Sequence, residues 1–164
     1  MGASSSKGPF TAVAYANPTS SPFSEVLTTL AVSAVAAYEI FADAVEIPRW
    51  LPIVQTARTM ARDSDGRPQR VAFTRMLERG SLGYTLEYSY DPTAFTVAWA
   101  TASASNVVLT GEAQFTPLSA RACLMRYRLV IDLPVVDDLI RSELNQHPAS
   151  HVVAEFREHL RRLC

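Results

Sequence analysis

Residues 84–92 read Tyr-Thr-Leu-Glu-Tyr-Ser-Tyr-Asp-Pro, and this stretch decides the fold. Its tyrosine and leucine side chains occupy every second position, between Thr, Glu and Ser, which is the period of a β-strand with one buried and one exposed face. The Asp-Pro-Thr that ends the run at 91–93 is a turn signal. We therefore predict a strand that turns its tyrosines inward and is followed by a tight turn.

The period of two recurs along most of the chain. Strands are expected at 54–62, 69–79, 82–90, 95–102, 107–116 and 123–133. The turn clusters at 63–68, 91–93 and 117–119 are too short to hold crossover helices. The pattern predicts an antiparallel meander in which neighbours in sequence are neighbours in the sheet.

Helical signals flank the strands. An additional strand at 25–32 is followed by Ser33, a good N-cap for a helix over 34–41, and by a second short helix or turn over 45–52 that Pro52 ends. After residue 134 the pattern is helical again and becomes clearly amphipathic. The apolar stripe of this long C-terminal helix consists of Ala149, Val152, Val153, Phe156, Leu160 and Leu163. The sheet is the large partner against which this stripe can pack, and whether Pro148 breaks the helix is left open.

Composition excludes several classes of protein. With 164 residues, 48% hydrophobic side chains and a net charge of −1, the chain suits one globular domain, and a polyanion such as nucleic acid is not expected as a partner. The longest apolar run, 30–37, is too short to span a membrane, so we expect a soluble, cytoplasmic protein. Cys123 and Cys164 are expected to be free thiols.

The first 23 residues, rich in Ser, Gly, Pro, Thr and Ala, are expected to form a flexible leader before a domain at 24–164. Gly2 with Ser6 fits an N-terminal acylation pattern that also occurs by chance. Transient membrane contact is therefore an open alternative.

The order of strand, two short helices, six strands and long helix resembles the START-like superfamily (SRPBCC, helix-grip fold), in particular its polyketide cyclase/dehydrase and lipid-transport branch. The residues that carry the resemblance are Asp43, Pro-Arg-Trp-Leu-Pro at 48–52, Asp-Gly-Arg-Pro at 65–68, the run at 84–92, Trp99, and Gly111 with Pro117. Ala113 departs from similar proteins, which often have Trp there, and would enlarge an inward-facing cavity. The resemblance implies an α+β helix-grip fold, with a seven-stranded curved antiparallel sheet that holds an apolar small molecule under the C-terminal helix.

The period of two also assigns the face that would touch this ligand. The expected ligand-facing residues are Tyr84, Leu86, Tyr88, Val97, Trp99, Ala113, Phe115, Met125 and Tyr127, with Trp50 at the cavity mouth. Each of these could instead be ordinary packed core, and for Trp50 the structural role is the favoured one.

A group of His and Glu residues near the C-terminus fits either a metal site or a solvated helix face. Four potential ligands lie four residues apart near the C-terminus: Glu143, His147, His151 and Glu155. The apolar stripe places His147 and His151 on the opposite, solvent-facing side, so neither a metal nor another cofactor is expected. His159 lies at the edge of the stripe and should be partly buried.

Familiar enzyme motifs such as G-x-S-x-G, H-E-x-x-H and C-x-x-C are missing from the sequence. The favoured function is a carrier or sensor of a lipid, isoprenoid or polyketide-like molecule. The alternative is a polyketide cyclase/dehydrase with acid-base groups among Tyr84, Tyr88, Tyr127 and Arg75, which the sequence does not distinguish. A cavity smaller than about 300 Å³ would instead favour a protein-interaction module.

Overall fold

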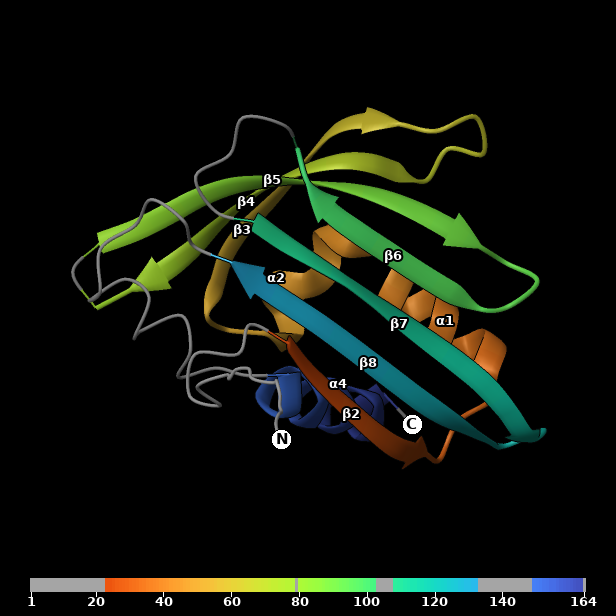
Figure 1. The fold of residues 1–164 in the computed structure, drawn as a ribbon. Coiled ribbons are helices and arrows are strands. Elements are labelled where there is room, and N and C mark those ends of the chain that lie inside the picture. Colours follow the sequence, from red (N-terminus) through yellow and green to blue (C-terminus); the bar gives the residue numbers. More distant parts are fainter. Residues whose placement is uncertain (1–22, 79, 103–107, 133–148, 164) are drawn as a thin grey trace, which may run out of the picture.

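The computed structural model describes residues 23–78, 80–102, 108–132 and 149–163. Seven strands and a few helices form these parts (Figure 1). In chain order they are β2 (Phe23–Leu30), α1 (Ala34–Ala42), the 3₁₀ turn η3 (Ala44–Glu46), α2 (Ile47–Trp50), β3 (Val54–Arg62), β4 (Pro68–Leu77), β5 (Gly80–Asp91), β6 (Thr96–Thr101), β7 (Val108–Ser119), β8 (Ala122–Asp132) and α4 (Ala149–Leu163). The predicted α+β helix-grip fold is confirmed.

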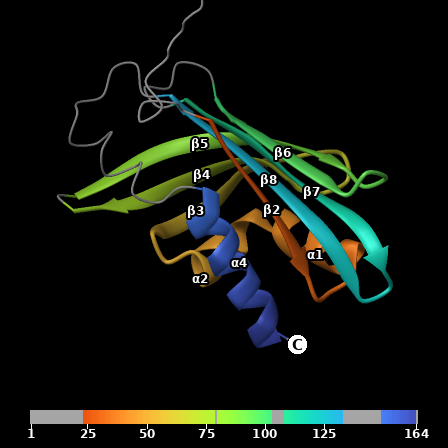
Figure 2. The same cartoon turned by 60° about the horizontal axis from the view of Figure 1, so that its bottom comes forward.

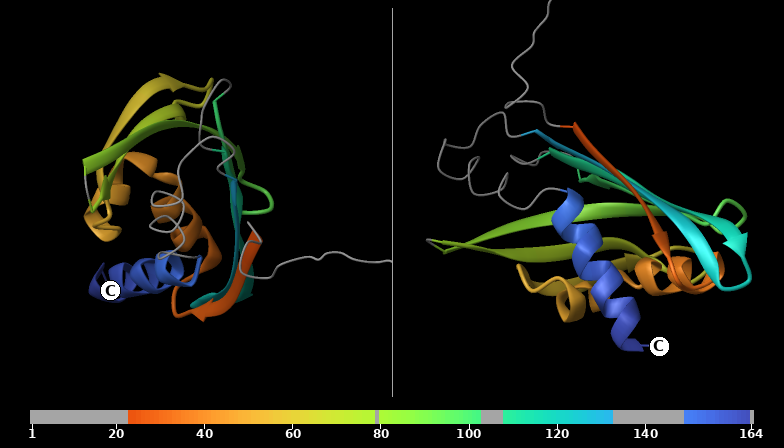
Figure 3. Two further views of the ribbon diagram at one scale, coloured as in Figure 1. Left: turned by 60° about the vertical axis from the view of Figure 1, so that its left-hand side comes forward. Right: turned by 90° about the horizontal axis from the view of Figure 1, so that it is seen from below.

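The seven strands make one antiparallel sheet in the order β2-β8-β7-β6-β5-β4-β3. From β3 to β8 each strand pairs with its sequence neighbour, which confirms the predicted meander. The first strand returns to pair with the last, from Phe23 opposite Val130 to Leu30 opposite Cys123. The sheet curves around the helices, as the left view of Figure 3 shows.

The two short helices follow from local capping chemistry. The Ser33 Oγ accepts a hydrogen bond from the Ala36 backbone N–H at 3.2 Å, which starts α1 where the sequence predicts it. The predicted short helix or turn over 45–52 is a 3₁₀ turn followed by a single helical turn with Pro48 near its start. Trp50 closes this turn and points into the core, where it is 2% exposed.

Helix α4 crosses the open side of the curved sheet and contacts β2, β8 and α2 (Figure 2). Its buried residues are Ala149, Val153, Phe156 and Leu160, which confirms most of the predicted stripe. Leu163, however, is 58% exposed, because the last turn of α4 projects beyond the sheet. The possible break at Pro148 lies outside the described residues, as do Glu143, His147, Cys164 and most of the leader.

Two further sequence expectations can be compared with the described residues. No helix among them is both long and apolar enough to cross a membrane. Cys123 is a buried free thiol, and burial raises its pKa, which disfavours the reactive thiolate.

Candidate functional site

A cavity lies inside the grip, where α2 and the start of α4 face the inner side of the sheet. Its volume is about 90 Å³. The short helices and the start of β3 contribute Phe41, Ile47, Trp50, Leu51, Ile53 and Val54, and α4 contributes His151 and Val152. The strands contribute Phe73, Arg75, Tyr84, Leu86, Tyr88, Trp99, Leu109, Tyr127, Leu129 and Ile131. The wall is therefore mostly apolar and aromatic, with a few polar groups.

The structure separates the predicted ligand-facing residues into two groups. On the cavity wall lie Trp50, Tyr84, Leu86, Tyr88, Trp99 and Tyr127. Buried away from the cavity lie Val97, Ala113, Phe115 and Met125. Helix α1 packs on β6, β7 and β8 and fills that half of the concave face, as the 5.9 Å separation of the Phe41 and Phe115 ring centroids illustrates. The inner face is thus half packed core and half cavity wall.

Ala113 faces inward, as the strand period requires, and is fully buried. It does not line the cavity. Protein atoms therefore cover this position, and the alanine does not enlarge the cavity at that point.

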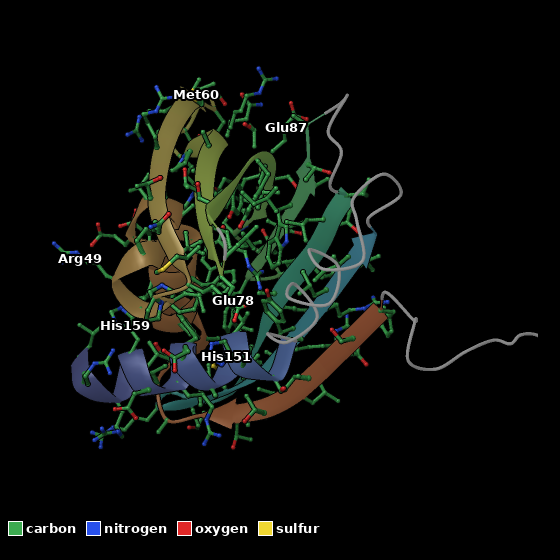
Figure 4. All side chains as sticks on the ribbon, turned by 90° about the vertical axis from the view of Figure 1, so that its left-hand side faces the viewer. Arg49, Met60, Glu78, Glu87, His151 and His159 are labelled. Carbon is green, nitrogen blue, oxygen red and sulfur yellow. The ribbon has the colours of Figure 1, made fainter. Side chains whose placement is uncertain are left out.

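His151 is placed differently from the prediction. The apolar stripe put it on the solvent-facing side of the helix, whereas the structure has it half-buried on the cavity wall, next to Val152 (Figure 4). Ala149 and Val153 point into the core, while His151 and Val152 line the cavity. The first turn of α4 therefore contacts both the core and the cavity. Among the described residues, no group of three His, Cys, Asp or Glu side chains could hold a metal ion.

Trp50 both packs and lines the cavity. Its ring contacts Phe156 at 5.1 Å and stacks on His159 at 6.3 Å, which joins α2 to α4. His159 is partly buried as predicted, and its pKa is lowered by burial and then by the positive charge of Arg162. The Trp50 indole Nε1 is buried and has no hydrogen-bond partner among the described residues.

Three tyrosines bring hydroxyl groups to the same space. Burial raises the pKa of Tyr84 to about 12, against the opposing charge of Arg75. Burial also raises the pKa of Tyr88 and Tyr127, and Arg75 acts on Tyr127 as it does on Tyr84. The Tyr90 hydroxyl is committed to the protein, since it donates to the Pro68 carbonyl at 2.5 Å. Tyr90 is thus a structural tyrosine, whereas the other three line the cavity.

Arg75 completes the polar part of the wall. It is 9% exposed, and the wall contains no Asp or Glu among the residues that the structure describes. The arrangement can surround an apolar molecule and offer hydrogen-bond donors to one or more of its oxygen atoms. The sequence pattern placed Tyr84, Tyr88 and Tyr127 on this face, and Arg75 was a candidate acid-base group beside them, whereas helical phase put His151 on the solvent-facing side.

Comparison with known proteins yields structural relatives only. No protein-family model and no curated protein sequence matches the chain. A START superfamily protein from Mycobacterium smegmatis superposes with a TM-score of 0.73 at 18% identity, over 87% of this chain and 99% of the other. The ZhuI aromatase/cyclase from a Streptomyces species gives a TM-score of 0.69 at 15% identity, over 87% and 95%.

A third relative is the di-domain aromatase/cyclase BexL, with a TM-score of 0.65 at 16% identity, over 85% of this chain and 46% of the other. All three identities are low, so the likeness concerns the course of the backbone. The meander, the paired short helices and the helix across the open side of the sheet agree with it. The protein therefore has the START-like, or helix-grip, fold.

Proposed function

We propose that this protein binds an apolar small molecule with at least one oxygen atom in the cavity beneath α4, as a carrier or sensor. The observation that carries the proposal is a cluster of polar groups on an otherwise apolar wall: the Trp50 indole N–H, which is buried without a hydrogen-bond partner among the described residues, and the side chains of Tyr84, Tyr88 and Tyr127. Buried polar groups in folded proteins are nearly always hydrogen-bonded, so several such donors around one space need either water or a ligand as acceptor.

The cavity is too small to hold a typical ligand without expanding. At about 90 Å³ it has room for several waters but is smaller than the ~300–1,000 Å³ of typical small-molecule sites. By volume alone it would favour an interaction module. The wall composition argues for a ligand, and the nearby end of α4 provides a way to expand, because His151 is half-buried there. We infer that a ligand larger than the cavity enters by an outward movement of α4, since His151 and Val152 of α4 form part of the wall.

Native mass spectrometry of gently purified protein, followed by lipid extraction, tests this proposal. We expect a co-purifying apolar molecule that is released unchanged. Intrinsic fluorescence is a second measurement, since both tryptophans of the chain, Trp50 and Trp99, lie on the cavity wall. If neither method detects binding across a panel of alkyl, isoprenoid and polycyclic compounds, ligand binding is excluded and an interaction module takes its place.

A second candidate function is a polyketide cyclase/dehydrase. It is supported by Arg75 close to the hydroxyls of Tyr84 and Tyr127, an arrangement suited to stabilising an enolate and moving protons, and by the two aromatase/cyclase relatives. Turnover of a poly-β-ketone that is lost in Tyr127→Phe, with substrate binding retained, would establish this function. Release of every bound molecule unchanged would exclude it.

A further inference from the structure

Arg75 is the single charged side chain that is buried among the described residues. It lies on β4, where Val71, Phe73 and Arg75 alternate with more exposed neighbours and share the inner face. Its place on the cavity wall is therefore set by the sheet and does not depend on a loop conformation. A buried charge needs hydrogen-bonding partners or a counter-charge, and Arg75 has at least one interaction within the protein.

The groups around Arg75 can all serve an anionic oxygen. Tyr84 lies on the adjacent strand opposite Phe73, with the two rings stacked at 5.7 Å, and Tyr127 comes from β8. Both hydroxyls are within the electrostatic influence of Arg75. Phenolic O–H groups can donate to a carboxylate, and a guanidinium binds it more strongly through charge-assisted hydrogen bonds. A guanidinium has five N–H donors, enough for a ligand as well as a protein partner.

The cavity wall away from Arg75 indicates that the rest of the ligand is apolar. Aromatic and aliphatic side chains, among them Phe41, Leu51, Leu86 and Trp99, cover the cavity away from Arg75. No described residue of the wall is acidic, so none of the wall residues that the structure describes repels an anion. A neutral hydrocarbon would leave the guanidinium and the hydroxyls desolvated without a new acceptor, which costs binding free energy.

We propose that the ligand is an amphipathic acid, with its anionic oxygen held by Arg75, Tyr84 and Tyr127 and its apolar part against the aromatic wall. This inference rests on the proposed function and narrows its ligand class from apolar molecules in general to singly charged acids such as a medium-chain carboxylic acid.

Octanoic acid and 1-octanol form a matched pair of probes, since they share a chain length and differ in the charged group at pH 7. Neither absorbs where tryptophan does, so titration can be followed through the fluorescence of Trp50 and Trp99. We expect the protein to bind octanoate at least tenfold more tightly than 1-octanol. Arg75→Gln should abolish this preference and retain alcohol binding, and Arg75→Lys, which keeps the charge, should retain part of it.

Arg70→Gln is the matched control, because Arg70 is on the same strand but exposed and paired with Glu87 at 2.7 Å. It should keep the full preference for octanoate. If the unmodified protein binds 1-octanol as tightly as octanoate or more tightly, the acid proposal is wrong, whereas the proposed function stands. This comparison needs no variant. An undiminished preference in a folded Arg75→Gln protein would also overturn it. Failure of both probes to bind would count against the proposed function itself.

Discussion

The indole of Trp99 lies against the backbone of Gly111, its pairing partner on the neighbouring strand. A Cβ atom at position 111 would come within 2.6 Å of the Trp99 Cζ2 and within 2.6 Å of the Arg128 carbonyl oxygen. The glycine is thus required by close approach and not by a special backbone angle. Glycine at position 111 thus allows the Trp99 indole to pack directly against the backbone of β7.

Gly111→Ala should therefore destabilise the protein by about 1–3 kcal/mol, the usual cost of overpacking a core. It should also shift the fluorescence of Trp99, because the ring must move. Gly83→Ala is the control: the nearest atom to its Cβ is the Phe73 carbonyl oxygen at 3.9 Å, an ordinary contact. Urea denaturation of both variants measures the difference. Equal stabilities would show that the sheet yields at position 111 without cost.

The fold could be predicted from the sequence because its elements have short, distinct periods. Alternation in residues 84–90 fixed the inward face, and the turn cluster at 63–68 left no room for a crossover. Element ends were less accurate, as at 45–52, where one predicted segment is a 3₁₀ turn followed by a separate helical turn. A sequence pattern shows only the region in which a periodicity fades. The residue at which a helix or strand ends is set by backbone hydrogen bonds.

The candidate site was less predictable, for a physical reason. Period two says that Phe115 and Tyr127 face inward, but it does not say that α1 fills the space over Phe115 and leaves Tyr127 on a cavity wall. Similarly, helical phase gave the stripe of α4 correctly at Phe156 but not the surroundings of His151. Whether an inward-facing residue is packed core or cavity wall depends on how closely the helices approach the sheet, and tertiary packing sets that distance.

Alkaline pH should weaken the fold through the buried tyrosines. The pKa of Tyr84 is raised to about 12, above an unfolded value of about 10, so the native state binds more protons between these pH values. The stabilisation is complete below pH ~10 and is lost as the pH rises towards 12, at about 1.4 kcal/mol per pH unit for each such tyrosine.

Urea denaturation at pH 9, 10 and 11 measures this slope. Tyr84→Phe should reduce the slope by the share of one tyrosine, because the ionisable group is removed. Absorbance at the phenolate band should show that Tyr84, Tyr88 and Tyr127 ionise only with unfolding. A stability that is flat up to pH 11 would contradict the burial of these hydroxyls.

The guanidinium of Arg67 connects α1 to the β3–β4 turn. It lies over the rings of Tyr38 and Tyr90, at 5.3 Å from each centroid, and pairs with Glu39 at 3.0 Å. Each cation–π contact contributes about 0.5–1 kcal/mol, or more when desolvated, whereas a half-exposed ion pair contributes about 0–1 kcal/mol. Arg67→Ala should thus cost about 1–3 kcal/mol and Glu39→Gln less than about 1 kcal/mol. Thermal unfolding of the two variants ranks the contributions, and a larger loss from Glu39→Gln would assign the link to the ion pair.

Phe156 makes the aromatic contacts that join α4 to the core. Its ring lies 5.3 Å from Phe41, 5.1 Å from Trp50 and 6.1 Å from Phe115, and it is fully buried. Phe156→Ala should cost about 3–5 kcal/mol, since it removes this ring from the middle of the aromatic core. Leu163→Ala, on the projecting last turn, should change stability by less than about 0.5 kcal/mol.

The proposed outward movement of α4 on ligand entry can be tested at the same residue. If ligand entry requires this movement, Phe156→Leu should keep the fold yet accelerate the binding of an alkyl probe in stopped-flow fluorescence. Unchanged association with reduced stability would show that the probe enters without displacing α4.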